Sequence, residues 1–60
     1  MKEKTIRTYN GKYGTVTVSE VRENGHIEYH VTHTHPSISA YWSESKRDAI
    51  LHAQFLVGKY

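Results

Sequence analysis

The chain has 60 residues, enough for one domain, and its 8 Lys and Arg against 6 Asp and Glu give a formal net charge of +2. A domain of this size buries only about 60% of the surface that its unfolded chain exposes, so its core is marginal. It has no cysteine, which excludes disulfides and thiolate metal sites; further stability would have to come from self-association or a partner.

The first ten residues, MKEKTIRTYN, contain no apolar run of the kind that a secretory signal requires. No stretch of the sequence reaches the ~20 apolar residues of a membrane span, so we expect a cytoplasmic protein without membrane contact. A strand is predicted from about Thr5 to Tyr9, which makes residues 1–10 an extra edge strand. The alternatives are that this segment is frayed or pairs with another chain.

A turn at Asn10-Gly11 would connect this strand to the next one, because both residues tolerate the positive φ of a tight hairpin. That turn pairs Ile6 with Thr15 and places Ile6 on a polar face. A β-bulge at Gly14 would restore the phase.

The Asn24-Gly25 dipeptide is the strongest hairpin signal in the chain. A two-residue loop here sets Val18 opposite Val31. One face of the hairpin is then mostly apolar, with Val16, Val18, Ile27, Tyr29 and Val31. The other face is mostly polar, with Thr15, Thr17, Ser19, Val21, Glu28, His30, Thr32 and Thr34. This pattern predicts an antiparallel pair that is covered on one side.

Pro36 cannot donate a backbone hydrogen bond, so the second hairpin strand is expected to end by His35. The alternation that follows predicts a short third strand with Ile38, Ala40 and Trp42 facing the core.

A helix is predicted to begin at Ser45, since Asp48 three residues later resembles a capping box, with Ser43 as the rival cap. It should run to about Val57, with Gly58 past its end. Together the elements predict an α+β fold, an antiparallel three- to four-stranded β-meander with one C-terminal α-helix packed on one face. The same elements predict a single β-β-β-α domain over residues 1–60.

The predicted helix is apolar on two sides. One stripe suits a core and consists of Ala49, Ile50, Ala53, Leu56 and Val57. Leu51 and Phe55 lie nearly opposite and are four residues apart, flanked by Asp48 and Lys59. Because a single sheet can cover one side only, we expect these four residues to form an interface with a second copy or another protein. The alternatives are that the N-terminal segment, with Ile6, covers Leu51 and Phe55, or that both side chains are simply exposed.

The five histidines raise the possibility of a metal site, and His33 and His35 share one face of a strand. No acid has an obvious ligand spacing, so surface histidines and no metal are predicted. Neither a nucleophile elbow nor a phosphate-binding glycine loop occurs, and a 60-residue fold has little room for a pocket. We expect no enzyme activity, no cofactor and no small-molecule substrate.

The stretch YHVTHTHPSISAYWSESKRDAILHA, Tyr29–Ala53, resembles the β-β-β-α part of HicB-type antitoxins. In that family a strand ending near a proline precedes a short strand, a small polar cap and a helix with an early alanine. Those antitoxins neutralise a partner toxin, so the resemblance implies protein binding, as an inhibitor, antitoxin or adaptor. The compact, cysteine-free chain is typical of phage-encoded or bacterial accessory proteins.

Nucleic-acid binding is the alternative hypothesis. Ser45-Lys-Arg-Asp-Ala followed by Ala53 is similar to the start of the last helix in double-stranded-RNA-binding domains. That resemblance implies phosphate contacts by Lys46 and Arg47. Three strands followed by a helix also resembles the arm-site DNA-binding domains of phage integrases. By that resemblance the polar sheet face would contact DNA through Thr15, Thr17, His30 and Thr32.

Overall fold

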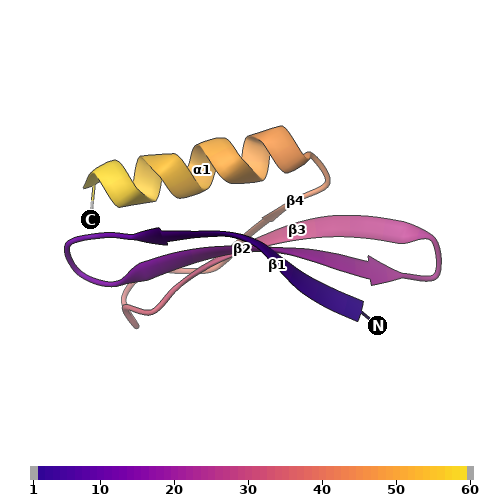
Figure 1. Cartoon of the computed structure of the whole chain (residues 1–60), viewed down its shortest axis with the longest axis horizontal. Helices are drawn as coiled ribbons and strands as arrows, with labels where there is room; N and C mark the ends of the chain where they lie inside the picture. Colours follow the sequence, from indigo (N-terminus) through magenta and orange to yellow (C-terminus); the bar gives the residue numbers. More distant parts are fainter. Residues whose placement is uncertain (1, 60) are drawn as a thin grey trace.

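The computed structural model describes residues 2–59 and confirms the predicted α+β fold. Within this range the chain forms four strands and a helix, which are β1 (Lys2–Asn10), β2 (Thr15–Glu23), β3 (His26–His33), β4 (Tyr41–Ser43) and α1 (Lys46–Lys59). The strands are antiparallel and lie in chain order, β1-β2-β3-β4. The helix lies along one face of the sheet, and the β2–β3 turn and the start of β1 extend past its N-terminal end (Figure 1).

The β2–β3 hairpin has the predicted register, with Val18 opposite Val31 and Glu23 opposite His26. Asn24 and Gly25 both have positive φ, 51° and 80°. A type I′ turn requires positive φ at both central positions, and asparagine and glycine adopt it at the lowest cost. The local sequence therefore determines this hairpin.

The predicted two-residue turn at Asn10-Gly11 is wrong. Asn10 pairs with Thr15, so the connection is a four-residue loop, closed by the Gly11 N–H donating to the Gly14 carbonyl oxygen at 2.8 Å. Gly14 has a φ of 155°, and a Cβ at this position would overlap the Thr34 hydroxyl oxygen. Glycine is needed here because the chain segment after β3 approaches the loop so closely.

The bulge is at Ile6 and not at Gly14. Thr5 pairs with Ser19 and Arg7 pairs with Val18, so Ile6 is the extra residue on β1. The extra residue changes the side-chain phase along the strand, and Ile6 packs against the core instead of lying on the polar face.

The third predicted strand is shorter than expected and has the opposite phase. It comprises only Tyr41–Ser43, while Ile38 contacts the core from the preceding loop and Ala40 is exposed. Trp42 pairs with His30 and is 60% exposed, so Tyr41 takes the inward place that was predicted for Trp42. A shift of one residue in a strand exchanges its two faces.

The core lies between the helix and the two central strands. It consists of Val16, Val18, Val31, Ala49, Ala53 and Leu56. The two alanines are fully buried, and their small side chains let the helix backbone approach the sheet closely. Val57 packs against this cluster, which confirms the predicted inner stripe except for Ile50. Ile50 is half-buried and lies outside the cluster.

Ser45 caps α1, because its hydroxyl accepts the Asp48 N–H at 3.2 Å. The Ser43 hydroxyl instead accepts the Ser45 N–H at 3.1 Å. The capping box is incomplete, since the Asp48 carboxylate accepts a hydrogen bond from Tyr41. The helix continues to Lys59, so placing Gly58 beyond its end was wrong. At 14 residues, the helix of the described region does not meet the length or the apolarity of a membrane span.

Candidate interaction surface on the helix

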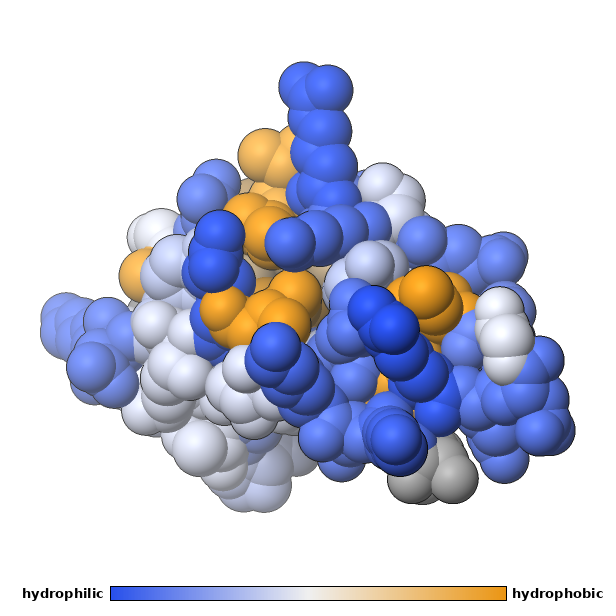
Figure 2. Space-filling model, turned by 45° about the vertical axis from the view of Figure 1, so that its right-hand side comes forward, coloured by the Kyte–Doolittle hydropathy of each residue, from blue (hydrophilic) through white to orange (hydrophobic). Residues whose placement is uncertain are grey.

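Leu51 and Phe55 form an apolar patch on the side of α1 that faces away from the sheet, here called the outer patch. Leu51 is 53% exposed and Phe55 is 59% exposed, whereas Leu56 on the opposite side of the helix is 6% exposed. The exposure predicted from the helical periodicity is confirmed. The alternative, that the N-terminal segment covers the patch, is wrong because Ile6 packs against the inner core. Hydrophobic side chains reach the surface in separate patches between hydrophilic ones (Figure 2).

Basic residues stand at both ends of the outer patch. Arg47 is four residues before Leu51 and Lys59 is four residues after Phe55, so the four lie on one row of i, i+4 neighbours that winds around the helix by about 40° per step. The Lys59 ammonium lies 5.7 Å from the centroid of the Phe55 ring, within the range of a cation–π interaction. A shallow, mainly apolar depression adjoins the patch and is lined by Lys46, Arg47, Ile50, Leu51 and Gln54.

The acidic residue predicted for this interface has a different role. The Asp48 carboxylate accepts a hydrogen bond from the Tyr41 hydroxyl, which holds the pKa of Asp48 below its usual range and raises that of Tyr41. The carboxylate therefore stays ionised, but it points toward β4. Of the predicted interface residues, Leu51, Phe55 and Lys59 come together, and Asp48 lies to one side.

An aromatic stack beside the patch was missed by the sequence analysis. The Tyr41 and His52 rings are stacked with their centroids 3.9 Å apart and an angle of 17° between their planes. His52 and Phe55 are 6.4 Å apart. The spacing of three residues between His52 and Phe55 could have indicated their contact. The stack of Tyr41 on His52 could not be foreseen in this way, because it depends on which face of β4 carries Tyr41. The stack joins the outer patch to the sheet.

The polar sheet face lies on the other side of the molecule. Val16, Val18 and Val31 are buried under α1, so their neighbours along the strands face away from the helix. These neighbours include the predicted nucleic-acid contacts Thr15, Thr17, His30 and Thr32. The other two predicted contacts, Lys46 and Arg47, are on α1. The fold does not bring the two groups together, and between residues 15 and 33 the polar face carries no Lys or Arg.

Three titratable side chains form a cluster on the polar face. Glu28 lies between two histidines, with its oxygens 3.0 Å from His26 Nε2 and 2.9 Å from His30 Nε2. These contacts, first that with His30, hold the pKa of Glu28 below its usual range. The Glu28 carboxylate is therefore shared by both imidazoles, on the partly exposed outer face of β3.

The histidine pair considered as metal ligands is hydrogen-bonded within the chain. His33 Nδ1 accepts the backbone N–H of His35 at 2.9 Å, and the two rings meet edge to face with centroids 6.4 Å apart. Across residues 2–59, no group of three or more His, Asp or Glu side chains is arranged to hold a metal ion.

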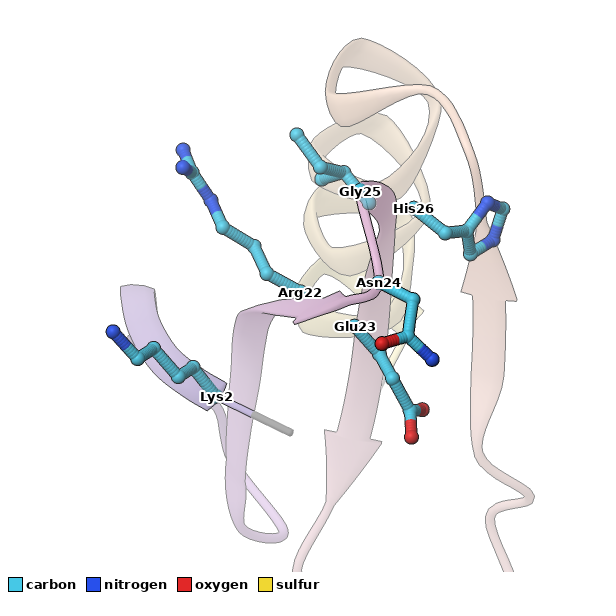
Figure 3. Close-up of a pocket in the computed structure, with 7 residues that line it drawn as sticks. Lys2, Arg22, Glu23, Asn24, Gly25 and His26 are labelled. Atoms are coloured by element: carbon cyan, nitrogen blue, oxygen red, sulfur yellow. The ribbon is translucent and has the colours of Figure 1, made fainter.

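A hollow at the tip of the β2–β3 hairpin also brings charged residues together (Figure 3). Its labelled side chains point in different directions and do not converge on a common point. Arg22 is paired with the carboxylate of Glu20, Nε to Oε2, at 2.9 Å, and this hydrogen bond lowers the pKa of Glu20. The hollow therefore lacks the converging polar groups of a ligand site.

No protein-family model, curated protein or solved structure matches the chain. The resemblances to HicB-type antitoxins and to double-stranded-RNA-binding domains stay predictions. The outer patch brings two large, exposed apolar side chains together on one side of α1.

Proposed function

We propose that this chain is a small, non-enzymatic binding protein that engages another protein through the outer patch. The observation that carries the proposal is the exposure of Leu51 and Phe55, 53% and 59%, side by side on the outer face of the helix. Single exposed apolar residues are ordinary on protein surfaces. Two large ones that adjoin each other and an apolar depression are typical of an interaction site.

The free energy that burial of Leu51 and Phe55 would contribute supports the proposal of a protein partner. Full burial of a leucine or phenylalanine side chain contributes about 1.5–3 kcal/mol, and about half of each residue is exposed here. A partner that covers both would therefore contribute roughly 2 kcal/mol from these two side chains. A 60-residue domain has a total stability of roughly 3–9 kcal/mol, so binding would also stabilise the fold noticeably.

An inhibitor, antitoxin-like or adaptor role agrees with the proposal, since each acts by occupying a protein surface without chemistry of its own. A second copy of the chain is another occupant of the patch that this proposal admits. Nucleic-acid binding is less well supported, because Lys46 and Arg47 lie on the helix and the predicted sheet contacts face the other way.

A photo-crosslinking amino acid at position 54 tests the proposal in cells that produce the chain. Gln54 is exposed and lines the depression beside Leu51, so irradiation should give discrete protein adducts. The same group at Thr8, which pairs with Thr17 on the polar face, is the matched control. The adducts should be absent when Leu51 and Phe55 are both replaced by Gln, which keeps the helix propensity of the leucine.

Two results would contradict the proposal. One is that position 54 gives no protein adducts. The other is that its adducts persist unchanged in the L51Q/F55Q variant. Retention on DNA or RNA that falls steeply with salt, and that the double substitution leaves intact, would favour the nucleic-acid hypothesis instead.

A further inference from the structure

We infer that the polar face of the sheet is a second interaction surface, and that it binds a segment of another protein that carries arginine. The surface consists of Trp42 and of the carboxylate-bearing residues Glu3, Glu23 and Glu28, and is called the Trp42 surface here. It lies on the other side of the sheet from α1 and the outer patch, so the inference goes beyond the proposed function and does not depend on it.

Three acidic residues surround Val21 on this face. Val21 is paired with Glu3 on β1 and with Glu28 on β3, and Glu23 follows Val21 by two residues. All four side chains therefore leave the same face of the sheet. Adjacent strands are about 4.8 Å apart and alternate residues of one strand about 6.7 Å, so the three acids form one continuous surface.

The cations of the strands lie on the opposite face. The rows that face the helix side carry every Lys and Arg of β1–β4, namely Lys2, Lys4, Arg7 and Arg22. Arg22 and Glu23 are adjacent on β2 and point in different directions (Figure 3). Within residues 2–59, Glu3 and Glu23 have no ion-pair partner. With histidines counted as neutral, the polar face is thus negative although the whole chain has a net charge of +2.

Trp42 adds an exposed aromatic surface beside these carboxylates. It is 60% exposed and lies directly opposite His30, whose Nε2 is 2.9 Å from Glu28 Oε2. Because Glu28 precedes His30 by two residues, Trp42 and Glu28 are diagonal neighbours across β3 and β4, about 7–8 Å apart. One cationic side chain can therefore reach the Trp42 ring and the Glu28 carboxylate together.

This combination of groups identifies the occupant. A guanidinium group stacks on an aromatic ring and pairs with a carboxylate through the N–H groups at its edge, so arginine suits the site better than lysine does. The Glu28 carboxylate has about four acceptor positions and the two histidines use one oxygen each, which leaves positions for a ligand. Nucleic-acid phosphates would meet three like charges here.

The fluorescence of Trp42 reports binding at this surface, because it is the only tryptophan in the chain. The probe is a synthetic peptide in which three arginines alternate with glycine, blocked at both ends. Matched peptides have lysine or the uncharged citrulline in place of arginine. The arginine peptide should change the fluorescence saturably, the lysine peptide should bind more weakly, and the citrulline peptide should bind at least about tenfold more weakly.

Substitutions on the two faces provide the matched controls. E28Q should weaken the arginine peptide several-fold, and E3Q/E23Q/E28Q at least about tenfold. E20Q neutralises one carboxylate on the helix-facing side, where Glu20 pairs with Arg22, and should leave the affinity unchanged. Trp42→Ala should also abolish binding, followed by NMR titration because this variant has no fluorescent reporter. Circular dichroism verifies that each variant is folded.

The position of Thr8 keeps the earlier crosslinking control separate from this surface. Thr8 is on β1, at the opposite edge of the sheet from Trp42, and pairs with Thr17 outside the rows described here. A group at Thr8 should therefore not report on the Trp42 surface.

Several outcomes would overturn the inference. They are the absence of a saturable change with the arginine peptide, an equal response to the citrulline peptide, and unchanged binding in E28Q or Trp42→Ala. Loss of peptide binding in L51Q/F55Q would also overturn it, because the peptide would then occupy the outer patch. A DNA or RNA duplex that changes Trp42 fluorescence while the arginine peptide does not would assign this face to nucleic acid instead.

Discussion

Replacing both Leu51 and Phe55 by Gln should change the stability of the isolated chain less than truncating one core residue. About half of each residue is exposed, so at most about half of the 1.5–3 kcal/mol of full burial is lost at each site. The double variant should therefore lose no more than roughly 3 kcal/mol, about 1.5 kcal/mol at each site, and Gln retains the helix propensity of leucine. Leu56 is 6% exposed and belongs to the core cluster, so Leu56→Ala alone should cost about 2–5 kcal/mol.

Urea unfolding followed by circular dichroism measures both values at a chain concentration low enough to exclude association. The slope of the unfolding free energy against urea should be the same for all three proteins. The reasoning would be refuted if L51Q/F55Q lost as much stability as Leu56→Ala. In that case the outer patch would belong to the hydrophobic core and could not serve as a free surface.

Three further substitutions test the details of the fold. Gly14→Ala should destabilise the chain by about 1–3 kcal/mol in urea unfolding, because its Cβ would overlap the Thr34 hydroxyl oxygen; an unchanged midpoint would contradict that close approach. Ser45→Ala should cost about 1 kcal/mol, and Ser45→Asp should restore most of it, since the cap needs a side-chain oxygen. Tyr41→Phe removes the hydrogen bond that lowers the pKa of Asp48 from 3.8. A lowered carboxylate pKa stabilises the fold above the unfolded-state pKa. This stabilisation is lost as the pH falls through the folded-state pKa. Wild type should thus be the more stable at pH 7, and its advantage should shrink as the pH falls below 3.8 in acid-titrated unfolding.

The elements that the sequence predicts well are those determined by local chemistry. Asn24-Gly25 accounts for its turn by backbone preference alone, and the alternation on either side then places Val18 opposite Val31. Likewise, the helical spacing of Leu51 and Phe55 is enough to place them opposite the core. These features need no knowledge of distant contacts.

The predicted β1–β2 turn was wrong because two turn signals compete within five residues. Asn10-Gly11 has the favoured residues of a two-residue turn, but the chain uses Gly14 to admit the close approach of Thr34. That contact joins positions 20 residues apart, so the local sequence does not contain it. The bulge at Ile6 could not be predicted either, because it depends on the register between β1 and β2.

The phase of β4 could not be predicted from hydrophobicity. Tyr41 and Trp42 are both large aromatic residues, and the alternation from Ile38 favoured burial of Trp42. The structure turns Tyr41 inward, where its ring stacks on His52 and its hydroxyl reaches Asp48. These contacts are formed with the helix, so the local sequence of the strand does not contain them. The position of Asp48 relative to the outer patch could not be predicted for the same reason.

Solvent accessibility in solution tests most directly whether the outer patch is free in the isolated chain. A soluble paramagnetic agent broadens the NMR signals of exposed groups, and the Leu51 methyls and the Phe55 ring protons can be compared with the Leu56 methyls. We predict strong broadening at Leu51 and Phe55 and weak broadening at Leu56 at low chain concentration. Equal protection of all three side chains would contradict the account.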